Sequence, residues 1–136
     1  MRECVNAGKG DEVKREEFKK ELETRTRKFA VQTLNALARF PEIRVLNVVV
    51  YQLSKSATSV GANYREANRA ESKDDFVHKL GIVVKEASET VYWLEICQEV
   101  DVLSPEEKAS ILPLLSEANE LYALFQSISR SVRCSE

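Results

Sequence analysis

Three segments of the chain carry seams of apolar and small residues whose spacing alternates between three and four. This spacing places the seam residues on one face of an α-helix and is typical of helices that pack against one another. It therefore predicts three long helices. The seams are Leu46, Val50, Leu53, Ala57, Val60, Tyr64 and Ala67; Phe76, Leu80, Val83, Ala87, Thr90, Leu94 and Cys97; and Ile111, Leu114, Ala118, Leu121, Phe125, Ile128 and Val132.

A further helix precedes them, because Phe29, Thr33, Ala36 and Phe40 form one more face and Pro41 ends the pattern. We predict helices at about 15–39, 42–70, 72–100 and 104–132, with a flexible charged tail over residues 1–14. Short connections force neighbouring helices to run in opposite directions. The sequence thus predicts an all-α, antiparallel, up-and-down four-helix bundle over residues 15–133.

Two helix starts carry capping signals. Ser72 precedes acidic residues that suit a helix N-terminus, and Ser104 is followed by a proline and, three residues on, by Glu107. Pro113 interrupts the last seam, so that the helix either kinks there or begins there after a short turn. We favour the kink.

The formal net charge of −2 hides an asymmetry, because residues 1–70 carry +5 and residues 71–136 carry −7. Either the two halves complement each other within one bundle, or the chain forms a polar assembly. No apolar run approaches the roughly 18 residues of a membrane span. The N-terminal stretch lacks the apolar core of a secretory signal, so we expect a cytoplasmic protein without a membrane partner.

The sequence carries no complete motif for a metal site, a nucleotide-phosphate site or a catalytic nucleophile. The three cysteines are far apart, so we expect reduced thiols, with Cys97 in the core. The single histidine, His78, does not complete the two E-x-x-H motifs of a dimetal bundle, and no glycine-rich loop precedes a helix. We expect no enzyme activity, catalytic residue, metal or cofactor.

The second helix is unusually poor in charge, since Lys55 is the one charged residue between Val45 and Tyr64. A helix facing solvent on one side normally carries more charge, so we expect a second subunit to cover it. Arg65 and the acidic residues of the third helix then either join two subunits or form an exposed ladder within helices. The predicted oligomer interface comprises Ser56, Ser59, Gly61, Asn63, Tyr64, Arg65, Glu66, Glu86 and Glu89.

Basic residues of the first two helices are candidates for contacts to RNA or DNA. Nucleic-acid binding needs basic groups on one face, whereas acidic residues intervene here and the isoelectric point is about 5.6. Repetition around a ring would gather the basic groups into one band. The candidates are Arg25, Arg27, Lys28, Arg39, Arg44, Lys55 and Arg69.

Residues 52–67, with the core S-A-T-S-x-G-A-N-Y-R-E-A over 56–67, resemble the signature of the 23S rRNA intervening sequence family. Segments 75–80, 85–90 and 92–95 resemble the family's third helix. The resemblance implies a bundle that assembles into a homopentameric ring, with a poorly defined activity. A related four-helix bundle is the accessory protein of diversity-generating retroelements, where it binds nucleic acid and a reverse transcriptase.

These features give two hypotheses. The leading one is a non-catalytic homo-oligomeric scaffold whose partner is a second copy of itself. The alternative is a ring that binds RNA, DNA or a nucleic-acid-processing protein.

Overall fold

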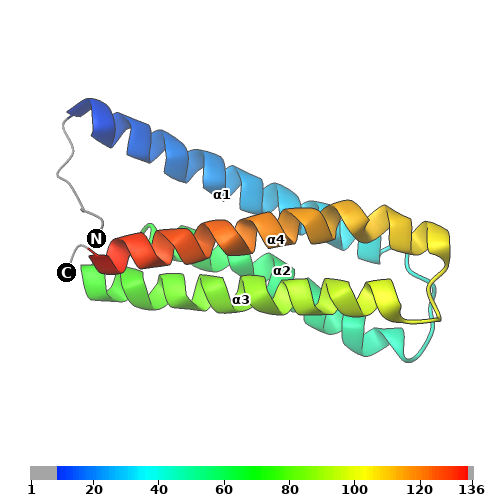
Figure 1. Ribbon diagram of the computed structural model, residues 1–136. Coiled ribbons are helices and arrows are strands. Elements are labelled where there is room, and N and C mark those ends of the chain that lie inside the picture. The colour runs from blue at the N-terminus through cyan, green and yellow to red at the C-terminus, as the bar shows by residue number, and fades with distance from the viewer. Residues whose placement is uncertain (1–8, 135–136) are drawn as a thin grey trace.

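The computed structural model describes residues 9–134, which form four helices joined by short connections. Adjacent helices run in opposite directions, each packs on its neighbour in sequence, and α4 also contacts α1 (Figure 1). This confirms the predicted all-α, antiparallel four-helix bundle. The helices are α1 (Lys9–Leu37), α2 (Leu46–Ala67), α3 (Lys73–Glu99) and α4 (Pro105–Cys134).

The core follows the predicted seams closely. In α2 every seam residue is buried except Val50, which is half-buried, while the adjacent Val49 is only 4% exposed. In α3 all seam residues but the half-buried Phe76 are buried. In α4 the seam is buried as far as Phe125, after which Ser129 turns inward. Interlocking apolar faces of this kind supply the main driving force for such a fold.

The inner face of α1 agrees with the prediction at Phe29 and Thr33, which are buried, whereas the predicted Ala36 and Phe40 are only half-buried. Leu22, Phe29 and Leu37 are buried together with two threonines, Thr26 and Thr33. Each threonine hydroxyl donates to the carbonyl oxygen four residues earlier in its helix, at 2.9 Å for Thr26 and 2.8 Å for Thr33. These bonds remove most of the cost of burying a hydroxyl group, so polar side chains complete the core of α1.

The predicted helix caps are present. Ser72 Oγ accepts a hydrogen bond from the Asp75 amide at 3.1 Å at the start of α3. At the start of α4, the Ser104 amide donates to Glu107 Oε1 at 2.8 Å and the Glu107 amide donates to Ser104 Oγ at 3.1 Å. This reciprocal pair is a capping box. The helix continues through Pro113, so the predicted alternative of a start near Pro113 is wrong.

Two predicted boundaries need correction. α1 begins at Lys9, so residues 9–14 are helical and not a tail; residues 1–8 lie outside the described part of the chain. α2 begins at Leu46 and not near residue 42, because residues 38–45 form turns and irregular backbone. Its N-cap is Val45, which provides no side-chain cap, so the sequence carries no signal for this start.

The N-terminal part of α1 diverges from the other helices (Figure 1). Residues 9–18 are all exposed, including Val13 at 60% and Phe18 at 44%. Leu22 is the first buried residue of α1, and the helix packs on α2 and α4.

Candidate assembly surface and interhelical cleft

Two residues predicted for the oligomer interface lie inside the bundle instead. Ser56 is 0% exposed, and its hydroxyl is hydrogen-bonded to that of Thr90 on α3 at 3.0 Å. Tyr64 is 2% exposed, and its ring lies 5.1 Å from that of Phe125 on α4. Because neither side chain reaches the surface, the interface prediction is wrong for these two residues.

Gly61 makes its close contact within the protomer. A β-carbon placed there would lie 2.9 Å from Thr26 Oγ1 on α1, which is closer than β-carbons approach other atoms. The glycine therefore lets α1 and α2 approach each other. We expected the small residues of α2 to admit a neighbouring subunit, whereas at Gly61 they admit another helix of the same chain.

Other predicted interface residues make local contacts. Ser59 Oγ donates to the Lys55 carbonyl at 2.6 Å, Asn63 Nδ2 donates to the Ser59 carbonyl at 2.8 Å, and Glu89 accepts a bond of 3.4 Å from Trp93 Nε1. Within residues 9–134, no ion pair joins Arg65 to an acidic residue of α3.

Two acidic members of the predicted interface, Glu66 and Glu86, differ in burial. Glu66 is exposed, and Glu86 is half-buried. The pKa of Glu86 is raised by burial first and by the neighbouring Glu89 carboxylate second, partly offset by Lys85 and Lys55. For Ser59, Asn63, Arg65, Glu66, Glu86 and Glu89, a role between subunits stays a prediction.

The beginning of α2 presents large apolar side chains to solvent that do not belong to the predicted seam. Val45 is 63% exposed, Val48 is 54% exposed and Tyr51 is 63% exposed. The signal was the run Val48–Tyr51, because four consecutive apolar residues cannot all face one side of a helix. Val49 faces inward, and Val48 and Tyr51 are left outside. We call Val45, Val48 and Tyr51 the α2 apolar patch.

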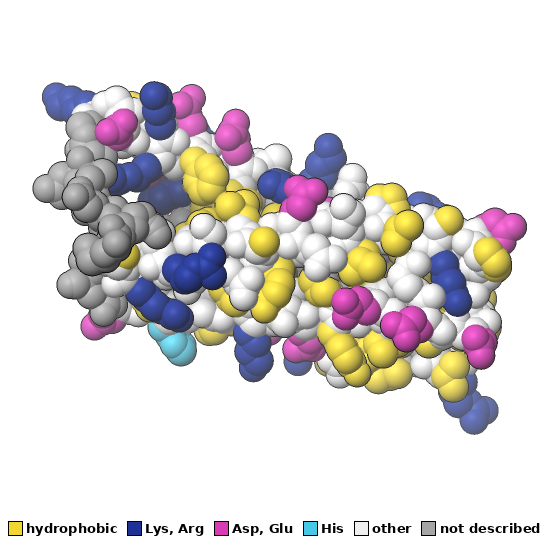
Figure 2. Space-filling view, viewed as in Figure 1, with side chains coloured by type: hydrophobic (Ala, Val, Ile, Leu, Met, Phe, Trp, Pro, Cys, Tyr) yellow, Lys and Arg dark blue, Asp and Glu magenta, His cyan; other side chains and the backbone are white. Residues whose placement is uncertain are grey.

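The adjacent part of α3 adds an aromatic group. Tyr92 is 54% exposed, and its ring meets that of Trp93 edge to face at 5.1 Å. Since the Ser56–Thr90 bond fixes the antiparallel register of α2 and α3, Tyr92 lies level with the N-terminal half of α2. Figure 2 shows hydrophobic side chains gathered at this end of the bundle beside acidic ones.

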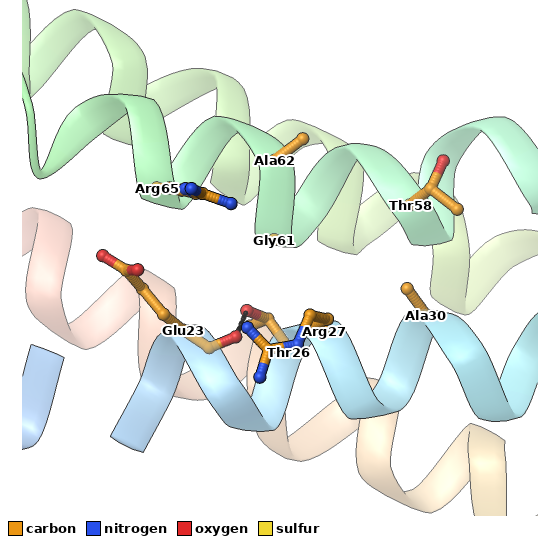
Figure 3. A pocket seen from close by; sticks show the side chains of 8 residues that line it. All are labelled: Glu23, Thr26, Arg27, Ala30, Thr58, Gly61, Ala62 and Arg65. Atoms are coloured by element: carbon orange, nitrogen blue, oxygen red, sulfur yellow. Dashed lines mark hydrogen bonds between the residues drawn. The ribbon is translucent and has the colours of Figure 1, made fainter. Parts of the chain in front are cut away.

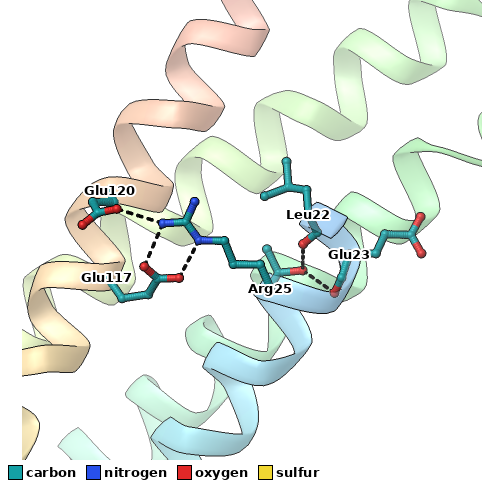
Figure 4. A network of polar contacts seen from close by, with 6 residues as sticks. Leu22, Glu23, Arg25, Glu117 and Glu120 are labelled. Carbon is teal, nitrogen blue, oxygen red and sulfur yellow. Dashed lines mark hydrogen bonds and ion pairs between the residues drawn. The ribbon is translucent and has the colours of Figure 1, made fainter. Parts of the chain in front are cut away.

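Arg25, a nucleic-acid candidate, is already engaged within the protomer. Its Nε donates to Glu117 Oε2 at 2.7 Å, and its Nη2 donates to Glu117 Oε1 at 2.8 Å and to Glu120 Oε1 at 3.0 Å (Figure 4). Hydrogen bonding to Glu117 is the main cause that raises the pKa of Arg25 above its usual range. Arg25 thus ties α1 to α4, and its contact to nucleic acid stays a prediction.

The remaining basic candidates are exposed but spread along the bundle. Arg39 and Arg44 belong to the α1–α2 connection, whereas Arg69 follows the opposite end of α2. A helix of 22 residues separates these groups by about 33 Å, at a rise of about 1.5 Å per residue. Arg27, Lys28 and Lys55 lie between them, so the six residues do not form one compact patch in the protomer.

A cleft of about 220 Å³ runs between α1 and α2. Arg27 from α1 and Arg65 from α2 lie on opposite sides of it (Figure 3). The cleft is lined by Glu23, Thr26, Arg27, Ala30, Thr58, Gly61, Ala62 and Arg65.

The histidine, cysteine and acidic side chains do not gather into a further site within the described residues. His78 is exposed, and Cys97 is fully buried, with a pKa raised to about 11 by burial. Over residues 9–134 there is no group of three or more His, Cys, Asp or Glu side chains that could hold a metal ion. No helix in that range is long and apolar enough to span a bilayer.

The fold and surface define a small all-α bundle with an exposed apolar patch and a two-arginine cleft. The chain matches the model of the 23S rRNA-intervening sequence protein family over residues 19–132, and it belongs to that family. Residues 9–18, the exposed part of α1, precede the match. No curated protein matches the sequence.

A solved structure of similar fold is the 1.70 Å crystal structure of a protein of unknown function from the S23 ribosomal protein family of Bacteroides thetaiotaomicron. It shares 33% sequence identity with a TM-score of 0.70. The similarity covers 82% of this chain and 97% of that one.

Proposed function

We propose that the protein is a cytoplasmic, non-catalytic homo-oligomer that acts as a binding scaffold. The α2 apolar patch is the observation that carries this proposal, because each of its side chains is more than half exposed. Soluble monomers scatter single apolar residues over their surfaces, whereas grouped ones mark contact sites. Covering Val48 and Tyr51 with a second copy removes both side chains from water.

The charge distribution supports contact between different faces of successive copies. Residues 1–70, which include α1 and α2, carry +5, and residues 71–136, which include α3 and α4, carry −7. Contact between unlike faces generates a ring when the rotation closes. We propose five subunits, the number implied by the resemblance to the 23S rRNA intervening sequence family.

Charge insertion into the patch tests the scaffold proposal. The double variant Val48→Glu/Tyr51→Glu places two carboxylates at exposed positions, so folding should be retained while association is lost. A matched control, Ala109→Glu/Ala123→Glu, places the same charges at exposed positions of α4. Light scattering should report monomers for the patch variant and oligomers for the control. A patch variant that stays oligomeric would remove the patch from the interface.

A further inference from the structure

We infer that the cleft between α1 and α2 binds a phosphate group between the guanidinium groups of Arg27 and Arg65. Both arginines line the cleft, from opposite helices, and both side chains are exposed. Neither guanidinium makes a hydrogen bond or ion pair within residues 9–134. Arg25, on the same helix as Arg27, is by contrast held by two carboxylates.

The other polar groups of the cleft are already occupied. Thr26 Oγ1 donates to the Leu22 carbonyl at 2.9 Å, and Thr58 Oγ1 donates to the Ser54 carbonyl at 2.7 Å. Glu23 Oε2 accepts a bond of 2.8 Å from Asn68 Nδ2 beyond the end of α2. The two arginines therefore supply the donors that are left, and their charge exceeds that of Glu23.

The chemistry of the donors selects the ligand. A guanidinium presents a planar fork of N–H groups that matches the oxygens of phosphate, and two such groups suit a doubly coordinated anion. The volume of about 220 Å³ is below the roughly 300–1,000 Å³ of pockets that enclose a whole ligand. The cleft therefore has room for one phosphate group, which is either a free phosphate ion or one phosphate of a larger molecule.

The shape of the cleft depends on Gly61 and Ala62. Gly61 lies against Thr26 and, without a side chain, leaves space at the base of the cleft. Ala62 is exposed at its rim. A longer neutral side chain at Ala62 would narrow the cleft at its rim without altering the charge of the arginines. This separates a shaped site from a general attraction of anions to basic residues.

Binding should be measured on the full chain by fluorescence anisotropy of a labelled 20-nucleotide single-stranded RNA, with inorganic phosphate as competitor. Loss of a charged hydrogen-bonding group costs about tenfold in affinity, so Arg27→Gln/Arg65→Gln should weaken binding by about a hundredfold. Lys28→Gln/Arg69→Gln removes the same charge from exposed residues outside the cleft and should weaken binding by less than about fivefold. Circular dichroism confirms that each variant is folded.

Two further variants sharpen the test. Ala62→Gln should weaken binding at unchanged charge, and Glu23→Gln should strengthen it by removing the one carboxylate of the cleft. Phosphate that displaces the RNA at low millimolar concentration identifies the free ion as sufficient. RNA binding that phosphate does not displace identifies a phosphodiester chain. Equal losses in the Arg27→Gln/Arg65→Gln and Lys28→Gln/Arg69→Gln variants, or no binding of the RNA at 150 mM salt, would overturn the inference.

Discussion

The hydroxyl groups of Ser56 and Thr90 lie 3.0 Å apart and are hydrogen-bonded across the contact between α2 and α3. Both side chains are at most 1% exposed. Each hydroxyl also contacts a carbonyl of its own helix, at 3.4 Å for Leu53 and 2.8 Å for Glu86. A polar pair inside an apolar seam favours one alignment of the two helices, because a shifted register would leave buried hydroxyls unpaired.

Removing this pair should lower stability. Ser56→Ala and Thr90→Val should each reduce the free energy of unfolding by about 1 kcal/mol, the typical net value of one hydrogen bond. Because the residues share a bond, the double variant should lose less than the sum of the two. Urea unfolding at one protein concentration measures all three, with Ser59→Ala as a hydroxyl control bonded only within its helix. Strict additivity would contradict a coupled pair.

The helical glycines Gly61 and Gly81 should respond in opposite directions to alanine. At Gly61 the new β-carbon meets Thr26 Oγ1 at 2.9 Å, so overpacking should cost about 1–3 kcal/mol. At Gly81 nothing lies within 4 Å, so the higher helix propensity of alanine should add about 0.5–1 kcal/mol. Thermal unfolding compares them, and a stabilising Gly61→Ala would show that α1 does not pack as described.

The sequence predicted the helices that pack through regular seams and failed where a residue's role depends on a distant partner. The seams of α2, α3 and α4 survive nearly unchanged because burial follows helical periodicity. Small residues are ambiguous, since Gly61 suits a close neighbour from the same chain or from another. Arg25 looked available because its partner, Glu117, is remote in sequence. The start of α2 was missed because no capping residue marks it.

The buried thiol of Cys97 should resist modification. Burial raises its pKa from 9.0 to about 11, so little reactive thiolate forms near pH 8. Iodoacetamide followed by peptide mass mapping should leave Cys97 unmodified in folded protein and alkylated in urea. Rapid alkylation under native conditions would contradict its place in the core.

The same shift predicts how stability changes at alkaline pH. The folded-state pKa is the higher one, so the unfolded chain loses this thiol proton first as pH rises above about 9. The contribution of Cys97 is therefore complete below pH 9 and declines as pH rises toward 11. Cys97→Ala should flatten this part of the curve of unfolding free energy against pH, whereas an unchanged curve would exclude Cys97 as its source.

Native mass spectrometry of the full chain tests the proposed assembly most directly. The protein should be purified without nuclease and without a high-salt wash, so that any bound nucleic acid is retained. The proposed pentamer should appear as a species of five times the 15.4 kDa chain mass, and the Val48→Glu/Tyr51→Glu variant should appear as single chains. Detection of the wild-type protein only as a 15.4 kDa monomer across micromolar concentrations would contradict the scaffold proposal.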